Sequence, residues 1–315
     1  MKDVTASVKV IYVAGSSRSG STVIDSLLGS YPDLVGTGEL DKLHQSGWTG
    51  NDYCGCGLEV RSCPVWEEVR EKWEVERGFS TPEYLTLQAS FSRLRQIPSI
   101  MIQSRLRRPR FIHYLEMTRA LFEVITEVSG VSGVVDSSKS PVRAMALSLI
   151  DGVDLNVIHR TRDSRGVATS LMKSWKKDPR TGIQTDLPGL PVSEVIRNWN
   201  RVNDAMTVVD RFSRSLSVRH FRYEDFLHDP CGWLDSIGDF LGKDFAEVAS
   251  RIDSPQGIPI GHTVAGNRLR MSRSVTLREA DPWSSLISAS DRASVESGCS
   301  RLMNRYGYSM SESPD

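Results

Sequence analysis

Residues 15–22, with the sequence GSSRSGST, combine the residue types that bind a phosphate group. Glycines let the backbone approach an anion closely, and the free N–H groups and dipole at a helix start favour negative charge. The hydroxyls of Ser19, Ser21 and Thr22 add hydrogen-bond donors. The spacing is close to that of a nucleotide-triphosphate loop, but Ser21 occupies the position of that loop's lysine. The cation is instead Arg18, inside the loop.

A second candidate anion site combines Arg162 and Ser170. The apolar run Leu155–Ile158 predicts a strand that ends shortly before Arg162, and a helical pattern over 164–175 carries Ser170. In an open α/β sheet, ligands bind beyond the carboxyl ends of the strands, where Arg162 is expected. The same residues also fit a surface ion-pair patch, with Ser170 bonded to its own helix backbone.

Together the two segments resemble the PAPS-dependent sulfotransferases, in the branch that includes tyrosyl-protein and many bacterial carbohydrate sulfotransferases. The resemblance implies a donor, 3′-phosphoadenosine 5′-phosphosulfate (PAPS), a product, 3′-phosphoadenosine 5′-phosphate (PAP), and no required metal. Arg162 and Ser170 take the 3′-phosphate, and Arg18 also stabilises charge on the oxygen that bridges to sulfur. The residues implied to bind the 5′-phosphosulfate are Ser17, Arg18, Ser19, Gly20, Ser21 and Thr22.

Three further segments resemble the same family. In the DSSK-P segment, Lys139 matches a lysine near the sulfuryl group. Asn267 and Arg268 belong to a late GN-x-x-R loop that approaches the adenosine. In the RYED element, Arg222 and Glu224 are expected to form a buried ion pair that closes the sheet.

Sulfuryl transfer also needs a base for the proton of the acceptor hydroxyl. Glu39 follows the first predicted helix and resembles the glutamate that serves as base in the tyrosyl-protein branch. With Arg18 and Lys139 it forms the candidate catalytic set, although a glutamate in a surface turn also fits the pattern. His44 is the reserve candidate, because an unperturbed imidazole titrates near neutral pH. His159 is expected to be structural.

Cys54, Cys56 and Cys63 lie within ten positions of one another. Such a group suits zinc, but a structural site wants four ligands, and His44 or Cys231 would complete it only if the fold brought them close. The alternative is packed or redox-active thiols. We assign no metal to the catalytic site. The five cysteines, odd in number and sparse, fit a reducing cytoplasm.

Strands and helices alternate along the chain, which predicts an α/β fold: a P-loop-like parallel β-sheet flanked by helices on both faces. We expect a single domain over 1–315, with a helical and loop insertion at about 45–110 and a frayed tail at 308–315. The insertion, with Trp175 and Trp199, would wall the acceptor site, although tryptophans at helical spacing also fit the core. The predicted strands are Val8–Ala14, Val134–Val135, Leu155–Ile158 and Leu216–Phe221, and the later helical patterns cover 111–128, 141–150, 164–175, 192–212 and 226–241.

The 315 residues carry 39 Lys and Arg against 39 Asp and Glu, so net charge does not indicate a nucleic-acid partner. Arginines gather in two runs without acidic residues, 85–115 and 254–278, which is consistent with positive potential around an anionic ligand or with solvated faces. We find no 18 consecutive apolar residues and no signal peptide. A soluble, cytoplasmic protein is expected.

The sequence therefore predicts a sulfotransferase that moves a sulfuryl group from PAPS to a hydroxyl of a small-molecule, glycan, lipid, natural-product or peptide acceptor. One alternative is a Mg²⁺-dependent phosphotransferase, in which Asp136 at a strand end would organise the ion. The missing loop lysine and the Arg162–Ser170 pair count against it. The other alternative is a protein that binds PAP without catalysing a reaction.

Overall fold

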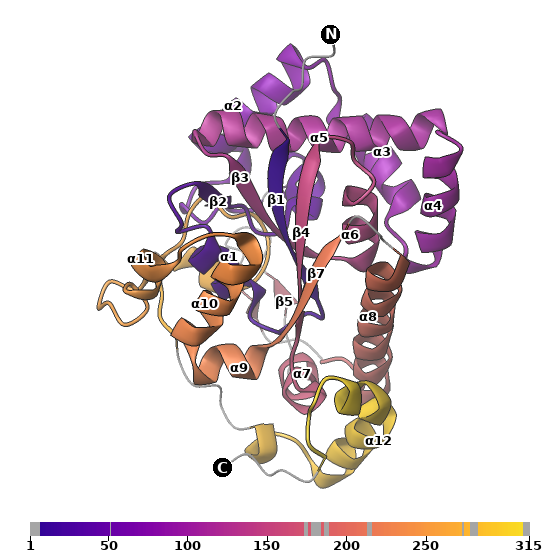
Figure 1. The fold of residues 1–315 in the computed structure, drawn as a ribbon, viewed down its shortest axis with the longest axis vertical. Helices are drawn as coiled ribbons and strands as arrows, with labels where there is room; N and C mark the ends of the chain where they lie inside the picture. Colours follow the sequence, from indigo (N-terminus) through magenta and orange to yellow (C-terminus); the bar gives the residue numbers. More distant parts are fainter. Residues whose placement is uncertain are drawn as a thin grey trace.

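The computed structural model describes residues 7–50, 52–172, 176–177, 184–185, 189–212, 216–272, 274–277 and 283–310 (Figure 1). Its strands are β1 Val8–Gly15, β2 Leu34–Gly36, β3 Gly133–Lys139, β4 Val153–Thr161, β5 Lys176–Lys177, β6 Gln184–Thr185, β7 Ser217–Arg222, β8 Ile258–Pro259 and β9 Ser274–Val275. Its α-helices are α1 Ser21–Leu28, α2 Pro64–Glu71, α3 Thr81–Phe91, α4 Ile97–Arg105, α5 Pro109–Ser129, α6 Pro141–Leu147, α7 Ser164–Met172, α8 Val192–Phe212, α9 Tyr223–His228, α10 Pro230–Leu241, α11 Ala246–Ala249 and α12 Ala289–Arg305.

The central sheet has five strands in the order β2-β3-β1-β4-β7, and neighbouring strands pair in parallel. The apolar, β-branched sequence of β1 suits its central place, because a strand covered on both faces has no polar side to present. The predicted strands and the parallel sheet are confirmed. The edge strand β2, only three residues long, was missed because so short a run carries no periodicity.

Helices cover both faces of the sheet, as predicted. Val10, Tyr12 and Ala14 of β1 pack into a core that includes residues of α5, α6 and α8. Ile11 and Val13, which point the other way, pack with residues of α1 and α10. In Figure 1, α5 and α8 border the sheet on one side, and α1, α10 and α9 lie on the other. The alternation of side chains along a strand divides the core into these two parts.

At its carboxyl end, β3 contains a bulge. Tyr12 pairs with Asp136, but Ala14 pairs with Lys139, so β3 has one more residue than β1 over this stretch. Lys139, the last residue of β3, has a left-handed backbone with φ 69°. A bulge redirects the side chains that follow it, and here it determines where Lys139 points.

Two expectations are corrected. The helix predicted over 226–241 is two helices, because Pro230 has no N–H to continue α9, and the Asp229 carboxylate caps α10 by accepting from the Gly232 N–H at 2.9 Å. The tail was expected to be frayed from residue 308, but Tyr308 is buried. The last residues, 311–315, lie outside the described part of the chain.

Candidate active site

A cavity of about 310 Å³ lies at the carboxyl edge of the sheet. Two cations, Arg18 and Lys139, and the carboxylate of Glu39 line it. The N-terminus of α1 also opens onto it, and its first N–H groups have no intrahelical acceptor. The remaining lining residues are Ser17, Gly20, Ser21, Thr22, Val23, Leu171, Gly266, Asn267 and Leu269.

The loop between β1 and α1 takes its shape from backbone conformations that few residues adopt. Gly20 has φ 80°, and a Cβ there would lie 2.2 Å from the Tyr223 ring, so only glycine fits. The predicted phosphate ligand Ser19 does not line the cavity. Its hydroxyl is fully buried and donates to the Ser16 carbonyl oxygen at 2.9 Å, so it holds the loop together.

Glu39 and Lys139 form an ion pair in the cavity wall, and both side chains are mostly buried. The Glu39 backbone N–H donates to the Val264 carbonyl at 2.9 Å, which fixes the turn that carries the carboxylate. Gly266, two residues after Val264, has no side chain to fill the adjoining part of the cavity. A Cβ on it would lie 3.3 Å from Thr22 Oγ1 and 3.4 Å from Glu39 Oε1.

Left-handed backbone conformations concentrate at this cavity. Among the described residues, four non-glycine residues have positive φ: Arg18, Arg107, Lys139 and Ala265. Two of them line the cavity and a third, Ala265, precedes the cavity residue Gly266. Each such conformation costs about 1–2 kcal/mol and persists where the surrounding structure enforces it. Both candidate cationic residues are therefore held in positions that an unstrained chain would not adopt.

Behind the cavity, the carboxyl group of Asp25 supports the turn before Glu39. It accepts from the Gly38 N–H at 3.1 Å and from the Ser137 hydroxyl at 2.7 Å. Burial raises the pKa of Asp25 to about 7, although these two hydrogen bonds oppose the shift. Asp25 thus joins α1, β3 and the Glu39 turn, a role that the sequence did not indicate.

Arg162 follows β4 and lies beside the loop. Its Nη1 donates to the Arg18 carbonyl oxygen at 2.7 Å, and its guanidinium is 5.3 Å from the Tyr223 ring centroid. Trp199, expected in the acceptor wall, is buried and donates from Nε1 to the Arg162 carbonyl oxygen at 3.1 Å. Ser170 lies on α7, next to the cavity residue Leu171. The structure thus brings Arg162 to the phosphate loop. Ser170 itself is not among the residues that line the cavity.

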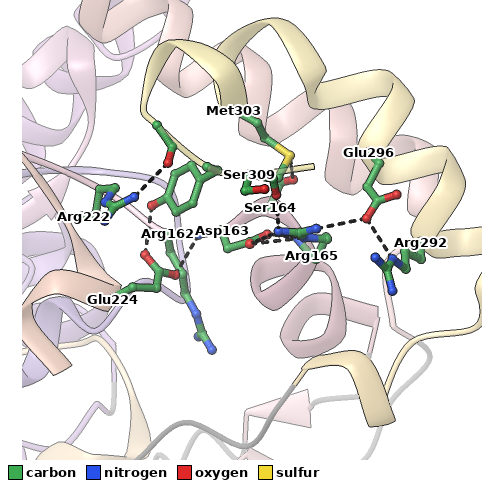
Figure 2. A network of polar contacts seen from close by, with 12 residues as sticks. Arg162, Asp163, Ser164, Arg165, Arg222, Glu224, Arg292, Glu296, Met303 and Ser309 are labelled. Atoms are coloured by element: carbon green, nitrogen blue, oxygen red, sulfur yellow. Dashed lines mark hydrogen bonds and ion pairs between the residues drawn. The ribbon is translucent and has the colours of Figure 1, made fainter. Parts of the chain in front are cut away.

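The segment after Arg162 is joined to the C-terminal part of the chain (Figure 2). Glu224 accepts from the Asp163 N–H and the Tyr308 hydroxyl, each at 2.9 Å. Arg165 donates to Asp163 and to the Ser309 carbonyl oxygen. The expected Arg222–Glu224 pair is wrong. Arg222 instead pairs with Asp225, because the side chain of Glu224 turns toward β4 and the end of the chain.

Arg160 was not singled out from the sequence. Its side chain is buried, and none of its guanidinium nitrogens has a hydrogen-bond partner among the described residues. Burial is the largest of the effects that lower its pKa, to about 9. The alternation of charged residues in HRTRD was a signal, but it does not say which arginine turns inward. His159, expected to be structural, is buried and bonded to Asn203.

Several candidates lie elsewhere. His44 is fully buried among Trp48, Trp73 and Tyr84, and neither ring nitrogen has a partner in the described structure, so it does not reach the cavity. Burial also lowers its pKa far below the usual value, which argues against a base. No described residue of 45–110 lines the cavity. The expected acceptor wall there is therefore absent from this cavity.

The later basic run does reach the cavity, through Asn267 and Leu269. Asn267 donates its backbone N–H to Thr22 Oγ1 at 3.4 Å. The side chain of Arg268 lies outside the described structure, as do residues 173–175, which include Trp175. Arg270 of the same run is fully buried and paired with Asp52.

The cysteine cluster includes a histidine that the sequence analysis did not single out. Cys54, Cys56 and Cys63 come together with His262, not with His44 or Cys231. The sequence separates His262 from Cys63 by 199 positions, so only the fold shows that they meet.

The strand-end carboxylate Asp136 does not face the cavity. It is fully buried and pairs with Arg143, whose Nε lies 2.8 Å from Asp136 Oδ2. A carboxylate neutralised in this way is not free to organise a Mg²⁺ ion, which weakens the phosphotransferase alternative.

A sequence model of the sulfotransferase family matches residues 11–247. That match spans the phosphate loop, Glu39, Lys139, Arg162 and Ser170. The chain belongs to the sulfotransferase family. This sulfotransferase shares its fold with two solved sulfotransferase domains. The sulfotransferase domain of the olefin synthase of Synechococcus PCC 7002 is 18% identical with a TM-score of 0.55, covering 98% of both chains.

The sulfotransferase domain from the curacin biosynthetic pathway is 15% identical with a TM-score of 0.55, covering 96% of this chain and 98% of that one. These identities establish a shared fold. A search of curated protein sequences found no match for this sulfotransferase. Within its described residues, no helix has the length and apolar character needed to cross a bilayer.

Proposed function

We propose that this sulfotransferase uses PAPS as donor and transfers its sulfuryl group to a hydroxyl of a small-molecule or glycan acceptor. The observation that carries the proposal is the convergence of Arg18, Lys139, Glu39 and the N-terminus of α1 on one cavity. Cations and helix N–H groups suit a phosphosulfate. The open side at Gly266 leaves space that a side chain would fill. The residue set therefore fits the donor.

In the proposed reaction, the acceptor oxygen bonds to sulfur as the bond from sulfur to the donor's phosphate oxygen breaks. Glu39 takes the proton of the acceptor hydroxyl. Arg18 and the first N–H groups of α1 bind the phosphosulfate and neutralise the charge that builds on the departing oxygen. Lys139, already close to Glu39, adds positive charge at the same place and orients the carboxylate.

The 3′-phosphate is assigned to Arg162 and Ser170. Arg162 bonds to the backbone of the phosphate loop itself, so the two anion sites are held at a fixed separation. The position of Leu171 in the cavity wall, next to Ser170, supports this assignment. Asn267 also lines the cavity and is assigned to the adenosine side.

The rival functions differ in what they bind. A Mg²⁺-dependent phosphotransferase would be stabilised by Mg²⁺ and ATP, and its turnover would need added Mg²⁺. For the sulfotransferase we expect PAP to raise the melting temperature and turnover to proceed without added Mg²⁺. Labelled PAPS, tested against sugars, lipids, phenols and peptides, then separates an enzyme from a protein that only binds PAP.

The donor assignment is tested by Arg162→Ala. Charge-assisted hydrogen bonds to phosphate are the strong ones, so PAP binding should weaken by about 2 kcal/mol or more, roughly 30-fold, in calorimetry. Arg219→Ala, an exposed arginine of β7, is the matched control and should leave PAP affinity unchanged. If Arg162→Ala binds PAP as tightly as the unaltered protein, the 3′-phosphate assignment is wrong.

A further inference from the structure

Three cysteines and one histidine bring their ligand atoms together away from the cavity. The Sγ atoms of Cys54, Cys56 and Cys63 and a ring nitrogen of His262 all lie within 4.8 Å of one another. Cys63 Sγ is 3.7 Å from Cys56 Sγ, and His262 Nδ1 is 3.7 Å from Cys54 Sγ and 3.1 Å from Cys63 Sγ. Among the described residues, this is the group of His, Cys, Asp or Glu side chains whose ligand atoms lie close enough together to hold a metal ion.

These distances are close to those of a single tetrahedral ion. Zinc binds sulfur at about 2.3 Å and nitrogen at about 2.0–2.1 Å, so the edges of its tetrahedron measure about 3.8 Å between sulfurs and about 3.6 Å between sulfur and nitrogen. The separations of 3.7 Å fit both edges. The 3.1 Å contact between Cys63 and His262 needs to open by about half an ångström.

The four ligands come from segments that other contacts already hold. Cys54 and Cys56 lie in a turn closed by an antiparallel bridge between Tyr53 and Glu59. Cys63 precedes α2, whose N-terminal dipole favours a thiolate. The His262 carbonyl oxygen accepts from Trp66 Nε1 at 2.8 Å, and the Gly55 N–H donates to the Thr263 carbonyl oxygen at 2.9 Å.

The ligand positions also differ in burial in a way that suits a structural ion. Cys54 and Cys63 are fully buried, whereas Cys56 is exposed and leaves a route by which an ion enters. Cys54 and Cys63 are buried side by side next to the half-buried His262. Packing alone does not explain this group, because apolar side chains would fill the same space without burying polar atoms.

We propose that Cys54, Cys56, Cys63 and His262 bind one Zn²⁺ ion in a closed, structural Cys₃His site. The three thiols release their protons to solvent as three S–Zn bonds form, and His262 binds as the neutral imidazole through Nδ1. All four positions around the ion are occupied by protein, so no water or substrate binds to it. The site is independent of the reaction assigned to the cavity.

The ion joins two distant parts of the chain. His262 is two residues before Val264, whose backbone bonds to both Thr37 and Glu39. The same segment continues into Gly266 and Asn267 of the cavity wall. The buried Arg270–Asp52 pair connects the same two parts a few residues away. Zinc therefore fastens the cysteine loop to the segment that supports the Glu39 turn.

The test is metal analysis of protein produced with zinc in the medium and purified without chelators. We expect about one zinc per chain by mass spectrometry of the metal, and a fall in melting temperature of about 10 °C or more when a strong chelator removes it. Cobalt(II) added to the metal-free, reduced protein should give tetrahedral d–d bands and thiolate-to-cobalt charge-transfer bands. The matched control, Cys231→Ser on the exposed surface of α10, should retain zinc and these bands.

Cys63→Ser and His262→Asn should lose zinc, but they alter packed positions and could fail to fold. Cys56→Ser decides in that case, because Cys56 is exposed and its loss removes a ligand without disturbing the core. It should bind cobalt at least 10-fold more weakly and lack one thiolate's share of the charge-transfer intensity. Three results overturn the proposal: reduced protein that takes up no zinc, iron in place of zinc, or a Cys56–Cys63 disulfide in purified protein that leaves no zinc bound.

Discussion

Glu39 and Lys139 form an ion pair in the wall of the cavity, so the charge of each affects the chemistry of the other. Lys139 bonds to Glu39 Oε1, and a carboxylate has a second oxygen that can face an acceptor hydroxyl. The same pairing holds Lys139 near the place assigned to the sulfuryl group. The roles proposed for them are separable, because Glu39 is assigned to the acceptor and Lys139 to the donor.

Glu39→Gln should lower the rate of sulfuryl transfer about 10²–10⁴-fold, which is the usual contribution of a general base. The substitution keeps the size of the side chain and removes the charge. PAP affinity should hold or rise, because a carboxylate that competes with the donor's phosphates for Lys139 is gone. Transfer of labelled sulfuryl group to the acceptor found by screening measures the first effect, and calorimetry with PAP the second.

Arg18→Ala supplies the contrast. Arg18 is assigned to the donor in both ground and transition states, so PAP affinity and rate should fall together. If Glu39→Gln folds normally and keeps full turnover, Glu39 is a turn residue and the base lies elsewhere.

Asp25 predicts a pH dependence of stability. Its pKa is raised by burial from 3.8 to about 7, so between these values the folded protein holds a proton that the unfolded chain releases. The free energy of unfolding therefore falls as pH rises from about 4 to about 7, by an amount on the order of 4 kcal/mol. Asp25→Asn, which does not ionise, should lose this component when urea unfolding is followed across that range.

Asp239→Asn, on the exposed surface of α10, is the matched control and should keep the pH dependence of the unaltered protein. A pH profile in Asp25→Asn that is parallel to that of the unaltered protein would show that Asp25 ionises at the same pH in the folded and unfolded chain, and that burial does not raise its pKa.

At the scale of elements, the loop between β1 and α1 and the bulge in β3 place the cations. Arg18 and Lys139 both take left-handed conformations, one from a tight loop and the other from an added residue at a strand end. The loop keeps its shape because Gly20 packs directly against Tyr223, the ring that also lies under Arg162. The two proposed anion sites thus share one aromatic support.

Gly20→Ala tests that support. The new Cβ meets the Tyr223 ring at 2.2 Å and the residue keeps φ near 80°, so stability should fall by about 2 kcal/mol or more in urea unfolding. Gly242→Ala is the matched control: it has φ 62° at the end of α10 with no atom within 4 Å of the added Cβ. Its cost should be the conformational part alone, about 1–2 kcal/mol, and smaller than that of Gly20→Ala. Equal costs for the two variants would mean that the ring moves freely and supports nothing.

At the scale of the whole molecule, the end of the chain returns to the segment that follows Arg162. Tyr308 is buried and its hydroxyl bonds to Glu224 and to Thr161 at the end of β4. Arg165 reaches the Ser309 carbonyl oxygen. The C-terminal residues therefore brace the start of α7, which carries Ser170.

Removing residues 308–315 should lower stability by about 3 kcal/mol, because a buried aromatic side chain and its hydrogen bonds are lost together. Thermal and urea unfolding measure the change. The matched control ends at Met310, which keeps Tyr308 and the Ser309 carbonyl and should be nearly as stable as the full chain. A shorter variant that is as stable as this control would show that the contacts of Tyr308 contribute nothing.

The sequence by itself determined the parallel sheet, the phosphate loop at residues 15–22 and the order of strands and helices along the chain. Strand runs, the glycine and serine loop and the Arg162–Ser170 spacing are local patterns, and local backbone preferences fix what they form. They led to Arg18, Glu39 and Lys139, which the structure brings to one cavity. The hydroxyl of Ser19 turns inward and not toward the cavity, which residue type alone does not reveal.

Only the tertiary structure decided which distant residues meet. Glu39 pairs with Lys139, and His262 approaches three cysteines, although these partners lie about 100 or more residues apart in the sequence. Asp25 supports a turn that is closer in the sequence, but its side chain reaches that turn only in the folded chain. Such contacts depend on how helices and loops pack over the sheet. Packing is set by the combined shape of many side chains rather than by any local period, so no pattern in the sequence encodes it.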